Sequence, residues 1–163
     1  MTESNYKYEG PKDKAQSLVD KARQAMKQSY SPYSGFSVGA AVLLQDGSII
    51  TGTNFENASY GLTLCAETVA VAIANNTGNL KNIVAIAIIG GKRQKDGFLI
   101  GKNPVYPCGR CRQILNEAAQ VSQCDLTVYC ASAEGDLIKE HKLSELIPFN
   151  FGPDDLGITA TES

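Results

Sequence analysis

Residues 64–89 read LCAETVAVAIANNTGNLKNIVAIAII and contain the two elements that decide the fold. Residues 64–75 are apolar on nearly every helical face, which predicts a buried helix. Residues 83–89 form a continuous apolar run, which is typical of a strand buried on both faces at the centre of a sheet. A buried helix followed by a central strand indicates an α/β protein.

Shorter patterned segments on both sides of this stretch complete the predicted fold. Helical periodicity or composition marks three segments, residues 13–29, 108–120 and 143–147. Four segments read as strands, the first two joined by a hairpin turn: residues 36–44, 48–54, 126–130 and 136–138. The order predicts one domain over residues 1–163, a three-layer α/β/α arrangement with a mixed five-stranded sheet. Residues 90–106 are expected to be a loop, and residues 1–10 and 157–163 flexible tails.

The composition is that of an ordinary globular protein. Of the 163 residues, 43% are hydrophobic and 20% are charged, and the formal net charge is −2. Nucleic-acid-binding proteins are usually basic, so this balance favours a small-molecule substrate and no nucleic-acid partner. No segment has the apolar length of a signal peptide or a membrane span. Five cysteines in such a chain favour reduced thiols, and hence a cytoplasmic protein with no membrane partner.

Two cysteine motifs predict a zinc site. They are Cys65-Ala66-Glu67 and the run PCGRCRQ at residues 107–113. Three thiolates, from Cys65, Cys108 and Cys111, leave the fourth tetrahedral position of Zn²⁺ open for water, as in catalytic zinc sites. A nearby carboxylate that does not bind the metal can shuttle protons for that water, and this role falls to Glu67. The sequence therefore predicts one zinc ion per chain.

Positive charge is expected to surround the three thiolates. If the helices that begin near Cys65 and Cys108 converge, the positive ends of both macrodipoles favour thiolate over thiol. Three thiolates outweigh the charge of Zn²⁺, so cations must also withdraw charge from the sulfurs. Arg112 can donate charge-assisted hydrogen bonds to a thiolate, and Arg110 is a second candidate.

Other interpretations of these residues stay open at this point. The cysteines could be inert buried thiols that match the pattern by chance. A closed structural zinc site would need a fourth ligand from His141, Cys124 or Cys130. Cys124 and Cys130 are better explained as core or surface thiols, and His141 as a solvated residue. The basic run at residues 92–95 is typical of a solvated loop.

Together, these motifs resemble those of cytidine deaminases of the small homotetrameric type, which bind zinc through three cysteines. The resemblance extends from about residue 22 to residue 156 and includes three further blocks, PYSGF at 32–36, NFENASYG at 54–61 and FGPDDL at 151–156. It implies zinc-dependent hydrolysis of cytidine and deoxycytidine to uridine and deoxyuridine with release of ammonia, in pyrimidine salvage. Glu67 would take a proton from the water that attacks C4 of cytosine, protonate N3 and help expel ammonia.

The resemblance also implies which residues hold the nucleoside. Phe36 would stack on the pyrimidine, and the backbone of Ala66 would bind the edge of the base. Asn54 and Glu56 would hydrogen-bond the ribose 3′-hydroxyl. From residue type alone, Phe36 could instead be a core aromatic, and Asn54 and Glu56 ordinary loop residues.

Two aromatic residues are implied to act between subunits. Tyr60 and Phe151 would each reach into the active site of a neighbouring subunit, so that sites are shared within a homotetramer. On sequence alone, Phe151, with Phe149 nearby, could equally be part of the core.

One position departs from the family pattern. Arginine commonly follows the Cys-Ala-Glu of these enzymes, whereas this chain has Thr68, which can hydrogen-bond but carries no charge. We expect Arg112, together with Arg110, to provide the missing compensation. The departure, together with a longer loop before Pro107, leaves an alternative activity open, namely deamination of another aminopyrimidine nucleoside of the blasticidin kind. A polynucleotide-editing deaminase and a structural zinc protein are further alternatives.

Overall fold

The computed structural model describes residues 11–158, so the predicted tail at 1–10 and all but the first two residues of the predicted tail at 157–163 lie outside this range. Its centre is one mixed sheet of six strands, of which five follow the order β2-β1-β3-β5-β6. The strands are β1 (Phe36–Leu44), β2 (Ile49–Thr53), β3 (Ile83–Arg93), β4 (Leu99–Ile100), β5 (Thr127–Ser132) and β6 (Ile138–Lys142). The α-helices are α1 (Pro11–Met26), α2 (Ala66–Asn76), α3 (Gly109–Ser122) and the short α4 (Leu143–Leu146).

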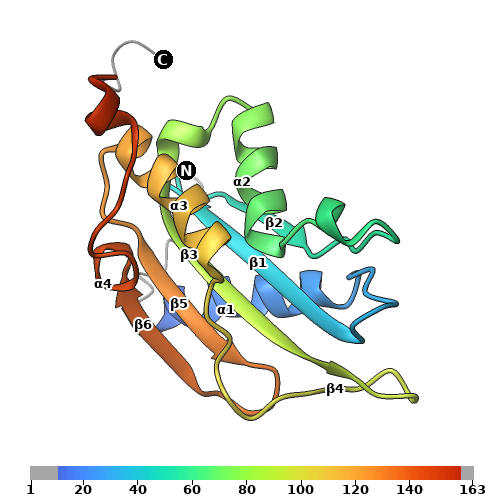
Figure 1. Ribbon diagram of the computed structural model, residues 1–163. Helices are drawn as coiled ribbons and strands as arrows, with labels where there is room; N and C mark the ends of the chain where they lie inside the picture. Colours follow the sequence, from blue (N-terminus) through green and yellow to red (C-terminus); the bar gives the residue numbers. More distant parts are fainter. Residues whose placement is uncertain (1–10, 159–163) are drawn as a thin grey trace, which may run out of the picture.

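Helices cover both faces of the sheet, as the sequence predicts (Figure 1). On one face, Leu18, Val19 and Ala22 of α1 pack against alternate residues of β1, β3 and β5. On the other face, α2 and α3 pack against the intervening residues of the same strands. This division follows from the strand geometry, because successive side chains point to opposite faces. The continuous apolar run of β3 serves both cores.

The strand directions explain how α3 reaches its position. Strand β1 pairs antiparallel with β2 and β3, and β6 pairs antiparallel with β5. The pair β3–β5 is parallel, with Ala87 beside Tyr129. Parallel neighbours need a crossover connection, and α3 provides it. The N-terminal ends of α2 and α3 therefore meet above the same face (Figure 1).

A glycine lets α2 lie close to the sheet. A Cβ atom added at Gly52 of β2 would be 2.5 Å from Ala70 N and 2.6 Å from Ala66 O. Atoms cannot approach so closely, so only glycine fits beneath the first turns of α2. This contact fixes the depth at which the N-terminal end of α2 sits.

Three predicted segments differ from the structure. The first helix ends at Met26, so residues 27–29, which were predicted to be helical, lie outside it. The predicted loop at 90–106 contains the end of β3 and the short strand β4, which pair through Lys92–Ile100 and Arg93–Leu99. The sheet consequently has six strands and not five. The last strand lies at Ile138–Lys142 and not at 136–138, because residues 133–137 form the turn that leads into it. Among the described helices, none combines the length and apolar character needed to cross a membrane.

Candidate functional site

The three predicted zinc ligands meet at the start of two helices. Cys65 is the N-cap residue of α2, and Cys108 is the N-cap residue of α3. Cys111 lies in the first turn of α3, and its backbone N–H points at Cys108 Sγ at 3.5 Å. The three sulfurs lie within 4.8 Å of one another. The convergence expected from the sequence is therefore present.

The three sulfurs fit a zinc ion. Zn–S bonds of about 2.3 Å in tetrahedral geometry place ligand sulfurs about 3.8 Å apart, so the observed cluster needs only a small contraction. Among the described residues, the group of potential ligands contains these cysteines alone. His141, Cys124 and Cys130 are not part of it, which removes the fourth ligand that a closed structural site would require. The three-cysteine set instead suits an ion with one open position.

The thiols of Cys65 and Cys111 also interact with each other. The pKa of Cys65 falls to about 6, chiefly because its sulfur accepts a hydrogen bond from the Cys111 thiol. The nearby charge of Arg110 also lowers this pKa, whereas burial and Glu67 oppose the shift. The pKa of Cys111 is raised, because its thiol donates to Cys65 and is buried. One thiolate is thus already favoured at neutral pH, as metal binding requires.

Glu67 lies in the first turn of α2, directly after the Cys65 N-cap and Ala66. It is a buried residue, only 4% exposed, and burial raises the pKa of its carboxyl group. Its own backbone N–H and the Cys111 thiol act in the opposite direction. A carboxyl whose pKa is raised toward neutrality can both accept and return a proton, which is the requirement for general acid–base catalysis.

The two arginines are arranged differently from what the sequence suggested. Arg112 donates from Nε to Pro107 O at 3.0 Å and from Nη1 to Leu146 O at 3.1 Å. Arg110 donates to Thr63 O at 3.3 Å. Within residues 11–158, neither guanidinium donates a hydrogen bond to a sulfur. Arg112 holds the backbone directly before Cys108 and ties it to α4.

Thr68 makes no hydrogen bond with its side chain in the described part of the chain. Its Oγ1 atom is buried and has no partner. The hydrogen-bonding capacity expected from its residue type is therefore not used in this structure. The position that commonly carries an arginine contributes neither charge nor a donor bond to the thiolates.

Phe36 is the first residue of β1, and Ala66 directly follows Cys65 at the start of α2. By strand alternation, Phe36 is on the same face as Val38 and Ala40, which pack toward α2 and α3. A Cβ added at Gly90 would lie 2.9 Å from Phe36 Cε1, so the aromatic ring lies directly over this glycine. Phe36 is partly exposed and not a core residue. The backbone N–H of Ala66 is in the first turn of α2, where N–H groups lack helical partners.

Asn54 and Glu56 are both buried and have complementary free groups. Asn54 Oδ1 accepts from Val38 N at 2.8 Å and from Ser29 Oγ at 2.5 Å, whereas Nδ2 donates to Phe36 O at 2.9 Å. One Nδ2 hydrogen therefore stays available. Glu56 Oε2 accepts from the backbone N–H groups of Tyr33 and Ser34 at 2.8 and 3.2 Å.

Glu56 is ionised more readily than an ordinary glutamate. Burial raises its pKa, but hydrogen bonds from Ser34 and from the backbone of Tyr33 and Ser34 outweigh burial, so that the pKa is lowered. An ionised carboxylate only accepts hydrogen bonds. Asn54 and Glu56 therefore offer one donor and one acceptor, which is the pair that a hydroxyl group satisfies.

The aromatic residues expected to act between subunits are at the surface. Tyr60 is 76% exposed, and its ring meets Tyr33 edge-on with centroids 5.8 Å apart. Phe151 is 59% exposed, although its carbonyl oxygen accepts hydrogen bonds from Gln113 and Asn116 of α3. Phe149 is almost fully exposed. Core packing, the alternative for Phe151, is thereby excluded in the described chain.

Sequence reasoning missed a set of polar residues behind Asn54. Ser29, Ser31, Ser37 and Arg93 form successive hydrogen bonds that end at its side chain. The four residues come from three separate segments of the chain. No motif or spacing brings them together, so only the fold could reveal them.

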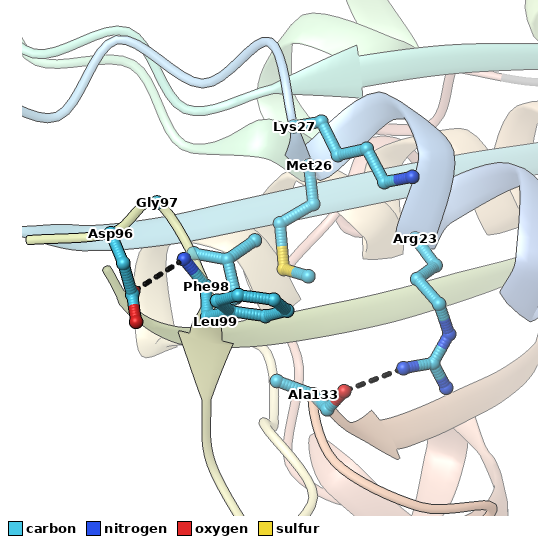
Figure 2. Close-up of a pocket in the computed structure, with 8 residues that line it drawn as sticks. All are labelled: Arg23, Met26, Lys27, Asp96, Gly97, Phe98, Leu99 and Ala133. Carbon is cyan, nitrogen blue, oxygen red and sulfur yellow. Dashed lines mark hydrogen bonds between the residues drawn. The ribbon is translucent and has the colours of Figure 1, made fainter. Parts of the chain in front are cut away.

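A separate cavity lies on the opposite face of the sheet. It has a volume of about 400 Å³ and is enclosed by the end of α1, the β3–β4 hairpin and Ala133 (Figure 2). Arg23 donates to Ala133 O at 2.6 Å across its edge. Met26, Leu99 and Ala133 belong to the core on the α1 side. Neither the cysteines nor Glu67 contacts this cavity, so it is not the reaction site.

Comparisons with known proteins show to which family the chain is similar. The family model described as "Cytidine and deoxycytidylate deaminase zinc-binding region" matches residues 12–126. The cytidine deaminase of Halalkalibacterium halodurans is 44% identical over 86% of this chain and 96% of its own length. A crystal structure of cytidine deaminase from Burkholderia pseudomallei is 34% identical, with a TM-score of 0.71 over 83% of this chain and 98% of that chain. The corresponding structure from Mycobacterium tuberculosis is 37% identical, with a TM-score of 0.64 over 84% and 96%.

Proposed function

This chain belongs to the cytidine deaminase family, and we propose that it is a zinc-dependent hydrolase that converts cytidine and deoxycytidine to uridine and deoxyuridine with release of ammonia. One observation carries this proposal. Three sulfurs within 4.8 Å of one another lie beside a buried carboxyl group, that of Glu67, which follows the Cys65 ligand after a single residue. A structural zinc protein has no need for a buried acid beside an incomplete ligand set.

The residues of the chain divide the chemistry among them. Cys65, Cys108 and Cys111 hold the zinc ion. When bound, zinc would act as a Lewis acid and lower the pKa of water toward neutral pH. Glu67 removes a proton from the attacking water, delivers it to N3 of the cytosine, and transfers a second proton to the amino group that leaves as ammonia. Its raised pKa suits all three transfers.

The nucleoside is held by groups on β1, on the loop that follows β2, and on α2. Phe36 stacks on the pyrimidine, and the free N–H of Ala66 meets the edge of the base. The ribose 3′-hydroxyl accepts a hydrogen bond from Asn54 Nδ2 and donates one to Glu56. A donor beside an acceptor suits the hydroxyl of a plain nucleoside, which favours cytidine over nucleoside antibiotics that lack this group.

We further propose a homotetramer with shared active sites, in which Tyr60 and Phe151 complete the site of a neighbour. Their exposure is compatible with this proposal, because both side chains are accessible to a neighbouring chain. All five cysteines are free, and a metal site made of thiolates needs a reducing environment. We therefore place the enzyme in the cytoplasm, in pyrimidine salvage.

The first experiment compares substrates with purified, zinc-loaded protein. Ammonia release is measured with cytidine, deoxycytidine, CMP and a short single-stranded oligonucleotide. We expect turnover of the two nucleosides alone. Zinc binding without turnover of any of the four would contradict the proposal, and turnover of the oligonucleotide would assign the chain to an editing deaminase.

A second experiment separates catalysis from structure. Glu67→Gln is expected to keep one zinc per chain and to lower kcat by about 10²- to 10⁴-fold, because it removes a general acid–base. Glu117→Gln, the same change at an exposed position of α3, is the control and should leave kcat unaltered. Equal rates for both variants would remove Glu67 from the mechanism.

A further inference from the structure

Three serine hydroxyl groups link the β3–β4 hairpin to Asn54. Arg93 Nη2 donates to Ser37 Oγ at 3.1 Å, and Ser37 Oγ lies 3.1 Å from Ser31 Oγ. Ser31 Oγ lies 3.3 Å from Ser29 Oγ, which donates to Asn54 Oδ1 at 2.5 Å. Ser37 is fully buried and Ser31 nearly so, and the backbone bridge between Tyr30 and Phe55 keeps Ser29 beside Asn54.

The hydrogen bond from Ser29 to Asn54 has a fixed direction. A carbonyl oxygen such as Asn54 Oδ1 can only accept hydrogen bonds. Ser29 Oγ has a single proton and is the donor in both of its contacts, at 2.5 Å to Asn54 Oδ1 and at 3.3 Å to Ser31 Oγ. The shorter contact takes the proton, so the Ser29 hydroxyl points toward Asn54.

Three hydrogen bonds set the orientation of the Asn54 amide. Oδ1 faces two donors, Ser29 Oγ and the backbone N–H of Val38, whereas Nδ2 faces the carbonyl oxygen of Phe36. A reversed amide would place its NH₂ group against both donors. Because Oδ1 is saturated, the remaining capacity of Asn54 is a single N–H donor.

We propose that Ser29 is a positioning residue that keeps Asn54 oriented as a hydrogen-bond donor to the 3′-oxygen of the nucleoside. This inference rests on the proposed function, in which Asn54 binds that hydroxyl. Ser29 does not touch the substrate; it acts through Asn54. Its contribution is recognition of the 3′-hydroxyl and not the chemical step.

The test compares Ser29→Ala and Ser29→Thr with cytidine and 3′-deoxycytidine as substrates. A net hydrogen bond corresponds to about fivefold in affinity, so Ser29→Ala should raise KM for cytidine about fivefold with kcat unchanged. With 3′-deoxycytidine, which lacks the hydroxyl, Ser29→Ala and wild type should have equal kcat/KM. Ser29→Thr keeps the hydroxyl and should behave as wild type. Ser48→Ala, at the exposed β1–β2 turn, is the control.

Arg93→Met provides a second comparison, because Arg93 donates to Ser37 and not to Asn54. This variant should leave KM for cytidine near the wild-type value. Equal losses of kcat/KM for Ser29→Ala with both substrates, or an Arg93→Met variant that raises KM for cytidine as much as Ser29→Ala, would overturn the proposal.

The outcomes also separate this inference from the proposed function. A wild-type enzyme that deaminates cytidine and 3′-deoxycytidine equally well would overturn the role of Asn54, and the role of Ser29 with it. A wild-type enzyme that prefers cytidine, with a Ser29→Ala variant that keeps this preference, would overturn the role of Ser29 alone.

Discussion

Cys65 and Cys108 occupy helix N-cap positions, where Ser, Thr, Asp or Asn usually accepts a hydrogen bond from the first turn. Cys65 makes no such side-chain bond, and Cys108 makes only the 3.5 Å contact to Cys111 N. Both side chains thus contribute little to helix capping, and their sulfurs stay available to a metal. The positive helix ends then favour the thiolate form that zinc requires.

At the same scale, Arg112 is predicted to control zinc retention through the backbone and not through a bond to sulfur. Its two bonds, to Pro107 O and Leu146 O, hold the residue before Cys108. Loss of such a supporting group typically costs 10- to 100-fold in metal affinity, and we expect this for Arg112→Ala. The measurement is zinc transfer to a colorimetric chelator.

Thr68→Ala is the comparison for Arg112→Ala, because Thr68 Oγ1 has no partner in the described part of the chain. This substitution removes no hydrogen bond and should leave the rate of zinc transfer within twofold of wild type. Small and equal effects of the two changes would show that Arg112 does not control zinc retention.

At the scale of elements, the fit between α2 and β2 sets the position of Glu67. Gly52→Ala would place a methyl group 2.5 Å from Ala70 N, and helix backbone cannot yield as a flexible side chain does. We expect α2 to shift, the unfolding free energy to fall by about 1 to 3 kcal/mol, and kcat to drop with it. Urea unfolding and cytidine turnover measure both effects.

Gly61→Ala is the control for Gly52→Ala, because a Cβ at Gly61 would have no atom within 4 Å. Its unfolding midpoint should equal that of wild type. If both variants unfold alike, the close approach of α2 to β2 is not what positions the start of the helix.

The elements that the sequence predicted well are those with a strong local pattern. Residues 64–75 and 83–89 have apolar runs that leave few alternatives; α2 begins within two residues of the first run, and β3 contains the second. Strand β4 was missed because a strand of two residues is too short to show an alternating hydrophobic pattern. Its pairing with Lys92 and Arg93 depends on how far β3 extends, which the sequence does not indicate.

The candidate site was likewise predictable only where its sequence pattern is local. Residues of one motif, such as Cys108 and Cys111, were predictable because their spacing alone brings them together. The partners of Arg112 were not, since Leu146 lies in a distant segment. The chain of serines behind Asn54 was hidden for the same reason, because serine is common in loops and only the folded sheet aligns Ser29 with Ser37.

For the whole molecule, the buried thiol of Cys130 predicts lower stability at alkaline pH. Burial, and to a lesser degree the charge of Glu67, raise the pKa of Cys130 from 9.0 to about 12. The unfolded chain therefore loses this proton first, and stability that is complete below about pH 9 declines as pH rises toward 12. Each pH unit in this window costs about 1.4 kcal/mol.

Cys130→Ala should consequently lose less unfolding free energy than wild type between pH 8 and pH 10.5. Cys124→Ala is the matched control, because Cys124 is only partly buried, and its pH dependence should parallel that of wild type. Urea titrations at the two pH values give the comparison. Parallel curves for wild type and Cys130→Ala would mean that this thiol ionises as readily in the folded protein as in the unfolded chain.

The exposure of Phe151 predicts that active sites are completed between chains. Phe151→Ala and Glu67→Gln should each be impaired as pure oligomers. In a mixed oligomer, a Phe151→Ala subunit keeps its own Glu67 and receives Phe151 from its Glu67→Gln neighbour, so one intact site is rebuilt. Co-expressed variants should therefore exceed the mean activity of the two pure proteins.

Phe98→Ala, also at an exposed phenylalanine, is the control: paired with Glu67→Gln, it should give only the mean activity of the two pure proteins. If the Phe151 pair also gives the mean, Phe151 acts within its own chain, and the shared-site arrangement is wrong.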